Sequence, residues 1–264
     1  MSLIHANQPL PRIFLANVGV NASHINLGLQ SPRFPDGRFE FIPIPELKEF
    51  QQASGFVRYN QLQCWNETNE SLARYIPINR ADLAVHADPD FTALTYGDEC
   101  GRTPRAAALK QAQPGDILVF LARLADYHNG LFTGQAGFYL VGFLEIARIL
   151  KDIRAQLEPA NFARYMHNAH FRRAQHDPRW YDGFYIFEGS ARSRRFQIAY
   201  PFGKAEAEQY LRDKSGQPFR WQEGRTELQT IGSYTRTCRC VLDAGRSAEE
   251  KSRALAFIGN ILLG

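Results

Sequence analysis

The pattern of apolar and polar residues predicts a chain of short strands with a few helices. Arg12–Val18 is a compact apolar run, typical of a buried strand, and it ends at Gly19 in a polar turn. Residues 116–121 and 137–143 are rich in aromatic and β-branched side chains, as central strands are, and a loop containing residues 126–130 separates them. We therefore expect these three runs to be strands of a buried sheet.

Shorter runs predict further strands. Apolar and polar side chains alternate over residues 39–42 until Pro43-Ile44-Pro45 ends the run, and residues 21–37 have the Asn, Ser, Gly and Pro content of a loop. Residues 183–187 and 196–200 form another pair, and the small, basic link between them suits a hairpin or a longer turn. Strands thus outnumber helices over this part of the chain.

Helices are expected in three places. Between residues 98 and 115, Thr103 suits an N-cap, Pro104 suits the first helical position, and a Pro-Gly pair ends the segment. Helical patterns return at residues 204–214 and 247–263, and the second begins with the capping-box sequence Ser-Ala-Glu-Glu before an apolar face that we expect to pack on the sheet.

No repeat, low-complexity tract or Gly/Ser linker divides the chain, so we expect residues 1–264 to form one domain. Its class is α+β, with a mixed, largely antiparallel central sheet and peripheral helices. A content of 44% hydrophobic and 12% aromatic residues is enough for a large core.

Several compartments and classes can be set aside. Residues 1–11 have neither the cationic start nor the apolar run of a signal peptide, which indicates a cytoplasmic protein. The most apolar stretch, residues 136–150, is too short to span a bilayer and contains Glu145 and Arg148. The four cysteines include no pair at the two-residue spacing that suits zinc, so we expect reduced thiols.

The charge composition favours anionic partners. The formal net charge is only +4, but the basic residues are 25 Arg and 6 Lys. The planar guanidinium group of arginine suits carboxylates, phosphates and base edges.

The segment His86-Ala87-Asp88-Pro89-Asp90 places an imidazole and two carboxylates within five residues. A histidine titrates near neutral pH, and a neighbouring carboxylate can orient its ring, so His86, Asp88 and Asp90 are our candidates for acid–base catalysis. The alternative is ordinary turn chemistry, in which Asp accepts backbone hydrogen bonds.

Histidines also raise the question of a metal. His86 with Asp88, and His167 with His170 near His176, are the two groups that contain candidate ligands, and a His-x-x-His pair would lie on one face of a helix. Neither group supplies a third ligand by its spacing, and the His-Glu-x-x-His signature is absent. We assign no metal and no cofactor from the sequence.

Residues 164–195 contain seven arginines and three acidic residues, interleaved with aromatic side chains. Aromatic rings stack on bases while guanidinium groups hold phosphates. The residues that we predict to contact nucleic acid are Arg172, Arg173, Trp180, Arg192, Arg194 and Arg195. The alternative is that some rings belong to the core and that the arginines are a solvated surface.

Common catalytic motifs are missing. The chain has no Gly-x-Gly-x-x-Gly, no Walker-type Gly-Lys-Ser/Thr and no Gly-x-Ser-x-Gly, which argues against dinucleotide, P-loop and hydrolase classes. Cys100 lies beside Asp98 and Glu99, whose charges raise a thiol's pKa, so we interpret it as structural.

Taken in order, several short blocks resemble the phage and bacterial family called nucleotide modification associated domain 3. They are Gly19-Val20-Asn21, Ser31-Pro32, Pro35-Asp36-Gly37, Pro43-Ile44-Pro45 and His86-x-Asp88-Pro89-Asp90, followed by Gly115-Asp116 and two hydrophobic strands. The resemblance extends over residues 12–200 and implies a role in base-modification systems, with nucleotides, nucleic acid and other base-modification enzymes as partners.

We expect polar loops near the histidine to handle the nucleotide, through Asn21, Ser31, Asp36, Asp98 and His128. Residues 115–124 and 137–146 also look like the paired strands of PUA-like barrels, which would make the protein a non-catalytic reader that holds a flipped, modified base in an aromatic pocket. The sequence does not decide between an enzyme and a reader. A structural or toxin-neutralising partner protein is the third alternative.

Overall fold

The computed structural model describes residues 10–67, 69–212, 217–221 and 223–262, and it is built around one large twisted sheet. Over these residues eight strands follow the order β10-β1-β6-β7-β8-β5, with β2 paired to β6 and β9 paired to β7. The pairs β1–β6 and β2–β6 are parallel, and the remaining ladders of this sheet are antiparallel. The edge strands β10 and β5 do not pair with each other, so the sheet stays open and the described strands form no PUA-like barrel.

The strands are β1 Arg12–Val18, β2 Ser31–Arg33, β3 Ile44–Pro45, β4 Val85–His86, β5 Thr95–Asp98, β6 Ile117–His128, β7 Leu131–Leu150, β8 Tyr185–Gly189, β9 Arg194–Pro201 and β10 Arg239–Asp243. The α-helices are α1 Ile153–Gln156, α2 Phe162–Tyr165, α3 Ala169–His176, α4 Lys204–Tyr210, α5 Glu227–Tyr234 and α6 Ala248–Phe257. Short 3-10 helices are η1 Ala22–Leu27, η2 Lys48–Phe50, η3 Tyr59–Gln61, η4 Leu72–Tyr75, η5 Ile78–Arg80, η6 Ala107–Gln111, η7 Pro159–Asn161 and η8 Pro178–Tyr181, and a π-helical turn, η9 Ile258–Leu262, follows α6.

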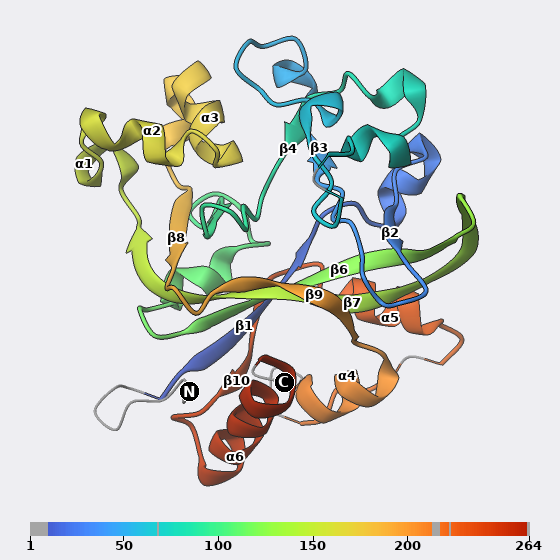
Figure 1. Ribbon diagram of the computed structural model, residues 1–264. Coiled ribbons are helices and arrows are strands. Elements are labelled where there is room, and N and C mark those ends of the chain that lie inside the picture. The colour runs from blue at the N-terminus through green and yellow to red at the C-terminus, as the bar shows by residue number, and fades with distance from the viewer. Residues whose placement is uncertain (1–9, 68, 213–216, 222, 263–264) are drawn as a thin grey trace.

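The central strands are buried on both faces. Successive side chains of a strand point to opposite faces, and in β6 Val119 and Leu121 join one core while Leu118 and Phe120 join the other. Helices α4, α5 and α6 cover the first face, below the sheet in Figure 1. This packing explains why the strand sequences are almost uniformly apolar.

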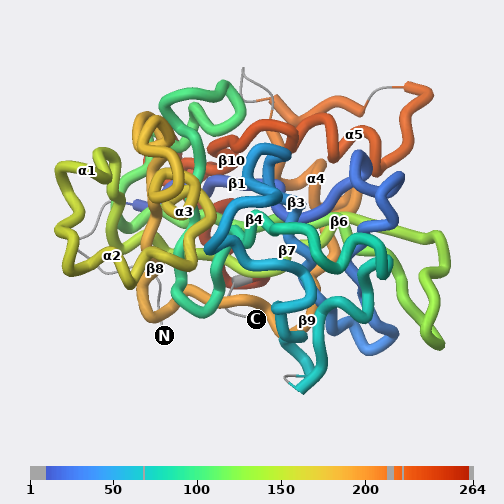
Figure 2. The backbone as a smooth tube through the Cα atoms, turned by 90° about the horizontal axis from the view of Figure 1, so that it is seen from above, coloured from blue at the N-terminus to red at the C-terminus, as the bar shows by residue number. Residues whose placement is uncertain are grey.

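Loops and short helices form a layer over the other face. In this layer β3 and β4 make a two-stranded ladder in which Ile44 pairs with His86. Helix α3 lies beside β4 both in Figure 1 and in the view from above in Figure 2, and it packs against β4 and β5. This layer holds the candidate site.

The predicted α+β class is confirmed, and so are the main strands. The first predicted strand has the bounds of β1. The run 116–121 lies in β6 except for Asp116, which precedes it, and the run 137–143 lies within β7; both strands are longer than the runs that predicted them. In place of the expected loop over residues 126–130, a tight turn at Asn129 and Gly130, both with positive φ, joins the two strands. Asn-Gly is a strong signal for such a hairpin.

Other local predictions were wrong. The helix expected after Thr103 is reduced to η6, whose N-cap is Ala106, and residues 39–42 form no strand. Strands β8 and β9 do not pair as a hairpin, because each pairs instead with β7.

The C-terminal helix was predicted correctly in position and packing. Ser247 caps α6 by accepting a hydrogen bond from the Glu250 amide, but Glu250 accepts from the amide of Asp243 instead of completing a capping box. The predicted ends at Lys214 and Leu263, and most of the segment 1–11, lie outside the described residues. Among the described helices, none has the length and apolarity needed to cross a bilayer.

Candidate active site

Two histidines and an aspartate from distant parts of the chain meet in the upper layer. His86 ends β4, Asp88 follows it, and His170 lies in the first turn of α3. One potential ligand atom from each residue lies within 4.8 Å of the others, and the three residues are 8%, 6% and 6% exposed. We call these three residues the His–Asp–His cluster.

A network of charged groups holds His86. Its Nδ1 lies 3.2 Å from the carboxylate of Glu46, which is brought close by the β3–β4 ladder. Arg173 on α3 donates from Nε to Glu46 over 2.9 Å and from Nη1 to Glu99 over 3.1 Å. The same Glu99 oxygen lies 4.0 Å from Nδ1 of His170, so one buried arginine connects the two glutamates that lie behind the two histidines.

Asp88 is held by one of its carboxylate oxygens. Oδ2 accepts hydrogen bonds from the Gly97 amide at 2.7 Å and from Nδ2 of Asn168 at 3.2 Å. Oδ1 is buried and has no hydrogen-bond partner. The peptide bond from Asp88 to Pro89 is cis.

Close packing fixes His170 against β5. Its ring lies edge-on to that of His86 at 4.6 Å between centroids and stacks on Phe184 at 5.9 Å. A Cβ at Gly97 would lie 2.7 Å from Cδ2 of His170 and 2.9 Å from Oδ1 of Asn168. Residue 97 therefore has room only for glycine unless the start of α3 moves.

Burial sets the charge states of the cluster. It lowers the pKa of His86 and lowers that of His170 well below its usual value, since a buried imidazolium lacks hydration, and the Arg173 charge lowers both further. Burial, together with the charges of Asp98 and Asp90, raises the pKa of Asp88 well above its usual range. Two neutral imidazoles thus lie beside a carboxyl group that retains its proton more readily than a solvated one does.

Glu46 behaves differently. Burial acts to raise its pKa, but the hydrogen bond with His86 and the charge and hydrogen bonds of Arg173 outweigh that effect and lower the pKa to about 2. A permanently ionised Glu46 can orient His86 through Nδ1. Together these groups can accept or donate a proton at a ligand, and the cluster contains the donor set that could hold a metal ion.

The structure separates the predicted catalytic residues. His86 and Asp88 lie together, whereas the carboxylate of Asp90 accepts hydrogen bonds from the amides of Thr92 and Ala93, which is the turn chemistry that the sequence also allowed. Catalysis by these residues stays a prediction. His170 was grouped with His167 and His176 instead of with His86. His167 precedes α3 and is exposed, so the pair His167 and His170 does not share a helix face.

The five residues predicted to bind nucleotide are dispersed. Asn21 caps η1, the hydroxyl of Ser31 accepts a hydrogen bond from the Ile42 amide, and Asp36 pairs with Arg38 at the surface. Asp98 is buried and accepts a hydrogen bond from the Tyr96 hydroxyl at 2.6 Å, and His128 is exposed at the end of β6. Nucleotide binding by these residues stays a prediction.

The predicted nucleic-acid-binding residues do not lie on one common surface. Arg172, Arg173 and Arg195 are buried, and each donates hydrogen bonds within the protein, Arg172 to carbonyls of residues 166 and 167 and Arg195 to that of Phe39.

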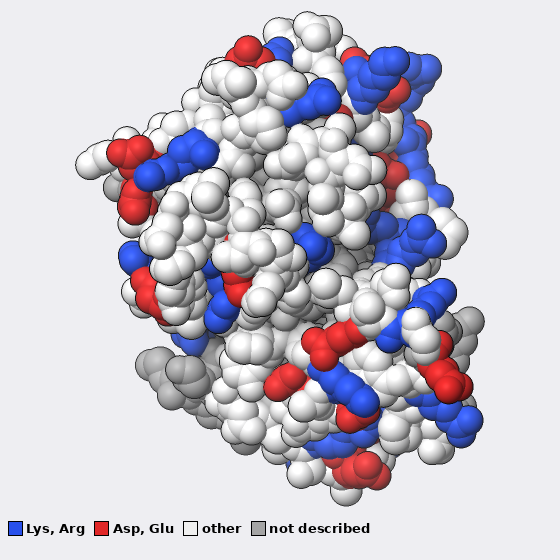
Figure 3. Space-filling model, turned by 90° about the vertical axis from the view of Figure 1, so that its right-hand side faces the viewer, with Lys and Arg blue, Asp and Glu red and all other residues white. Residues whose placement is uncertain are grey.

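The other three differ in their surroundings. Trp180 packs on Phe50 beneath the guanidinium groups of Arg102 and Arg173, Arg192 pairs with Glu145, and Arg194 is exposed. On the face seen in Figure 3, basic and acidic side chains are interspersed. Nucleic-acid contact through this segment stays a prediction.

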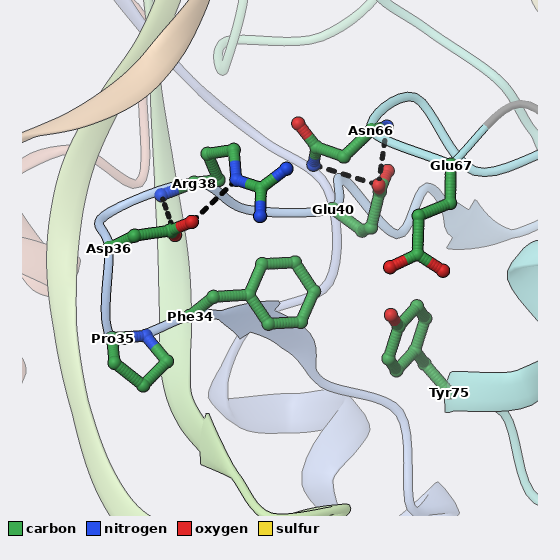
Figure 4. A pocket seen from close by; sticks show the side chains of 8 residues that line it. All are labelled: Phe34, Pro35, Asp36, Arg38, Glu40, Asn66, Glu67 and Tyr75. Carbon is green, nitrogen blue, oxygen red and sulfur yellow. Dashed lines mark hydrogen bonds and ion pairs between the residues drawn. The ribbon is translucent and has the colours of Figure 1, made fainter.

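A second recess lies apart in the same layer. It has a volume of about 260 Å³ and is lined by Phe34, Pro35, Asp36, Arg38, Glu40, Asn66, Glu67 and Tyr75. Figure 4 shows the rings of Phe34 and Tyr75 on its wall, with the carboxylate of Glu67 turned toward Tyr75. Glu40 is held by hydrogen bonds from Asn66 and from the Trp65 amide. This recess combines aromatic surface with hydrogen-bond acceptors.

Sequence reasoning missed Glu46, Asn168 and the site role of Arg173. Glu46 and Arg173 are 127 residues apart, and Asp88 and Asn168 are 80 apart, so no local spacing connects them. The Asn-x-His-x-x-Arg run from 168 to 173 was the available signal, because asparagine is a favoured N-cap and the histidine and arginine after it are three residues apart on one helix face.

Comparison with known proteins supports the resemblance noted in the sequence. No curated protein and no solved structure matches the chain. Residues 12–251 of 264 match the sequence profile described as nucleotide modification associated domain 3, a span that includes the His–Asp–His cluster and its supporting network. The chain therefore belongs to the nucleotide modification associated domain 3 family.

Proposed function

We propose that the protein acts on the base of a nucleotide at the His–Asp–His cluster. Membership of the family associates the chain with nucleotide modification. The cluster supplies groups that can move protons at a bound base, because neutral imidazoles accept protons and a carboxyl group of raised pKa donates one.

The observation that carries the proposal is the state of Asp88. Its Oδ1 atom is buried without a hydrogen-bond partner, although Oδ2 has two. A buried polar atom without a partner costs about 1–3 kcal/mol. A ligand that binds Oδ1 would remove this cost, which supports the cluster as the binding position.

The experiment separates binding from conversion. Fluorescence anisotropy would measure the affinity of the protein for a labelled single-stranded DNA and a matching RNA, and mass spectrometry of digested nucleosides would detect base conversion. Asp88→Asn should abolish conversion with binding largely intact. Asp82→Asn, at an exposed aspartate whose carboxylate accepts a hydrogen bond from Asn60, is the matched control and should convert bases as the native protein does.

Binding should weaken steeply as salt rises, because phosphate contacts release counterions. Absence of binding to both DNA and RNA at low salt would contradict the proposal and favour a structural partner protein. Conversion by Asp88→Asn at the native rate would exclude the cluster as the catalytic site.

A second candidate function is a non-catalytic reader, which the recess of Figure 4 favours. Phe34 and Tyr75 offer rings 6.0 Å apart on which a flipped base could stack, and the nearby carboxylates of Asp36 and Glu67 could accept hydrogen bonds from its amino group. Under this alternative Phe34→Leu should weaken binding about tenfold or more, as loss of stacking does, while Asp88→Asn leaves binding unchanged and no variant shows conversion.

A further inference from the structure

We propose that His86, Asp88 and His170 bind one divalent transition-metal ion. This inference rests on the proposed function only for its place, the His–Asp–His cluster, because a side-chain atom that binds a metal does not also exchange a proton with the base. Metal binding is measured without nucleotide, so its failure leaves the proposed function standing and is distinguishable from the failure of that function.

The donor set and its dimensions suit a metal. Each residue offers one ligand atom, and these atoms lie within 4.8 Å of one another. Nitrogen and oxygen ligands lie about 2.0–2.2 Å from Zn²⁺, so the ligand atoms around one ion are about 3–4 Å apart. In the structure these atoms are thus up to about 1 Å farther apart than around a bound ion, and binding would draw them together.

The Nδ1 atom of each histidine faces a glutamate. Nδ1 of His86 lies 3.2 Å from Glu46, and Nδ1 of His170 lies 4.0 Å from Glu99. Histidines that bind metals almost always present their other ring nitrogen to a carboxylate, a carbonyl or water, which orients the ring. This arrangement leaves Nε2 of each ring for the metal.

Arg173 connects these two glutamates. It donates hydrogen bonds to both Glu46 and Glu99 and is only 5% exposed. The two carboxylates therefore keep their positions relative to each other, and so do the rings in front of them.

Asp88 supplies the independent observation. Its side chain is fixed through Oδ2 by Gly97 and Asn168, and Oδ1 is buried with no partner. A cation bound to Oδ1 would give this oxygen the partner that it lacks. All three residues thus have one polar atom engaged or faced by a partner within the protein, and the second carboxylate oxygen of Asp88 has none.

The chemistry of the donors selects the class of metal. Two imidazoles with one carboxylate suit Zn²⁺ or Fe²⁺, whereas Mg²⁺ and Ca²⁺ prefer sites made of oxygen atoms. Bound there, such an ion would act as a Lewis acid beside the proposed base-binding position.

The test uses the full chain, without an affinity tag and dialysed against a chelator. Equilibrium dialysis with Zn²⁺, followed by elemental analysis, should give one ion per native chain, and Asp88→Asn and His170→Gln should each lose that ion. His167→Gln, an exposed histidine three residues before His170, is the matched control and should keep it. A native chain that binds no Zn²⁺, or an Asp88→Asn variant that binds it as well as the native chain, would overturn the inference.

Two measurements guard against variants that fail to fold. X-ray absorption of the Zn²⁺-loaded native protein should show nitrogen and oxygen neighbours with the scattering pattern of two imidazoles, and sulfur ligands would overturn the assignment. Glu46→Gln leaves the three ligands in place and should weaken Zn²⁺ binding about 10–100-fold, as loss of an outer partner does. Unchanged affinity in that variant would contradict the orienting role of Glu46.

Discussion

Replacing Arg173 with methionine tests whether this residue is a structural member of the site or a phosphate-binding residue. The guanidinium group is buried and donates hydrogen bonds to Glu46, whose side chain is completely buried, and to Glu99. Methionine keeps much of the volume but leaves the ionised Glu46 without its permanent countercharge. Breaking a buried ion pair by removing one partner costs about 3–5 kcal/mol, and we expect Arg173→Met to lower the free energy of unfolding by that amount at neutral pH.

The assay is urea unfolding followed by circular dichroism, with Arg164→Met as the matched control. Arg164 is 63% exposed and lies 3.7 Å from Glu188, and exposed pairs contribute about 0–1 kcal/mol. The double variant Arg173→Met/Glu46→Gln should recover about 0.5–3 kcal/mol relative to the sum of the single effects, which is the usual range for residues in contact.

Acid should remove the effect. The pKa of Glu46 is lowered to about 2 from an ordinary 4.5, so its ionised state stabilises the native fold above pH 4.5, and this contribution is lost as the pH falls toward 2. The difference between native protein and Arg173→Met should therefore shrink below pH 4.5. A cost under about 1 kcal/mol at neutral pH, together with weaker DNA binding, would refute the structural role and favour phosphate contact.

Three further predictions follow from local geometry. Gly97→Ala places a Cβ 2.7 Å from His170 and should lower the free energy of unfolding in urea by about 1–3 kcal/mol. Gly259→Ala, where a Cβ contacts nothing within 4 Å, should lower it far less, and equal losses would contradict the close packing. Burial raises the pKa of Cys64 to about 11, so iodoacetamide at pH 8 should modify this thiol slowly in the native protein and rapidly in urea. Mass spectrometry would measure the two rates, and rapid labelling of the native protein would be inconsistent with burial of Cys64. Asn129 has a φ of 50°, so Asn129→Val should lower stability by about 1–2 kcal/mol and Asn129→Gly should leave it nearly unchanged in thermal unfolding; a neutral valine would argue against the turn.

The strands of the core were predictable because their signal is local. β1, β6 and β7 are buried on both faces, and such strands show as continuous apolar runs. The pairing partners of β8 and β9 were not predictable, because β7 is long enough to pair with both, and nothing in the two short runs indicates this.

The candidate site was only half predictable. His86 and Asp88 are neighbours in the sequence, so their spacing suggested shared chemistry, but His170 joins them through the packing of α3 against β4 and β5. The number of arginines did not show which of them bind phosphate. An arginine that pairs with a buried carboxylate cannot be told apart in the sequence from one that binds phosphate. Arg173 illustrates this, since its carboxylate partner Glu46 lies 127 residues away.

Nucleotide handling at the His–Asp–His cluster is tested most directly by amide NMR during titration with a short single-stranded oligonucleotide. The amide of Gly97 donates to Asp88, and the amide of Phe171 donates to Asn168 in the first turn of α3, so both report on the cluster. We expect the largest shift changes at residues 86–99 and 168–173, and we expect them to persist in Asp88→Asn, which should still bind. Changes confined to the recess around Phe34 and Tyr75, or to the surface near Arg194, would contradict this expectation.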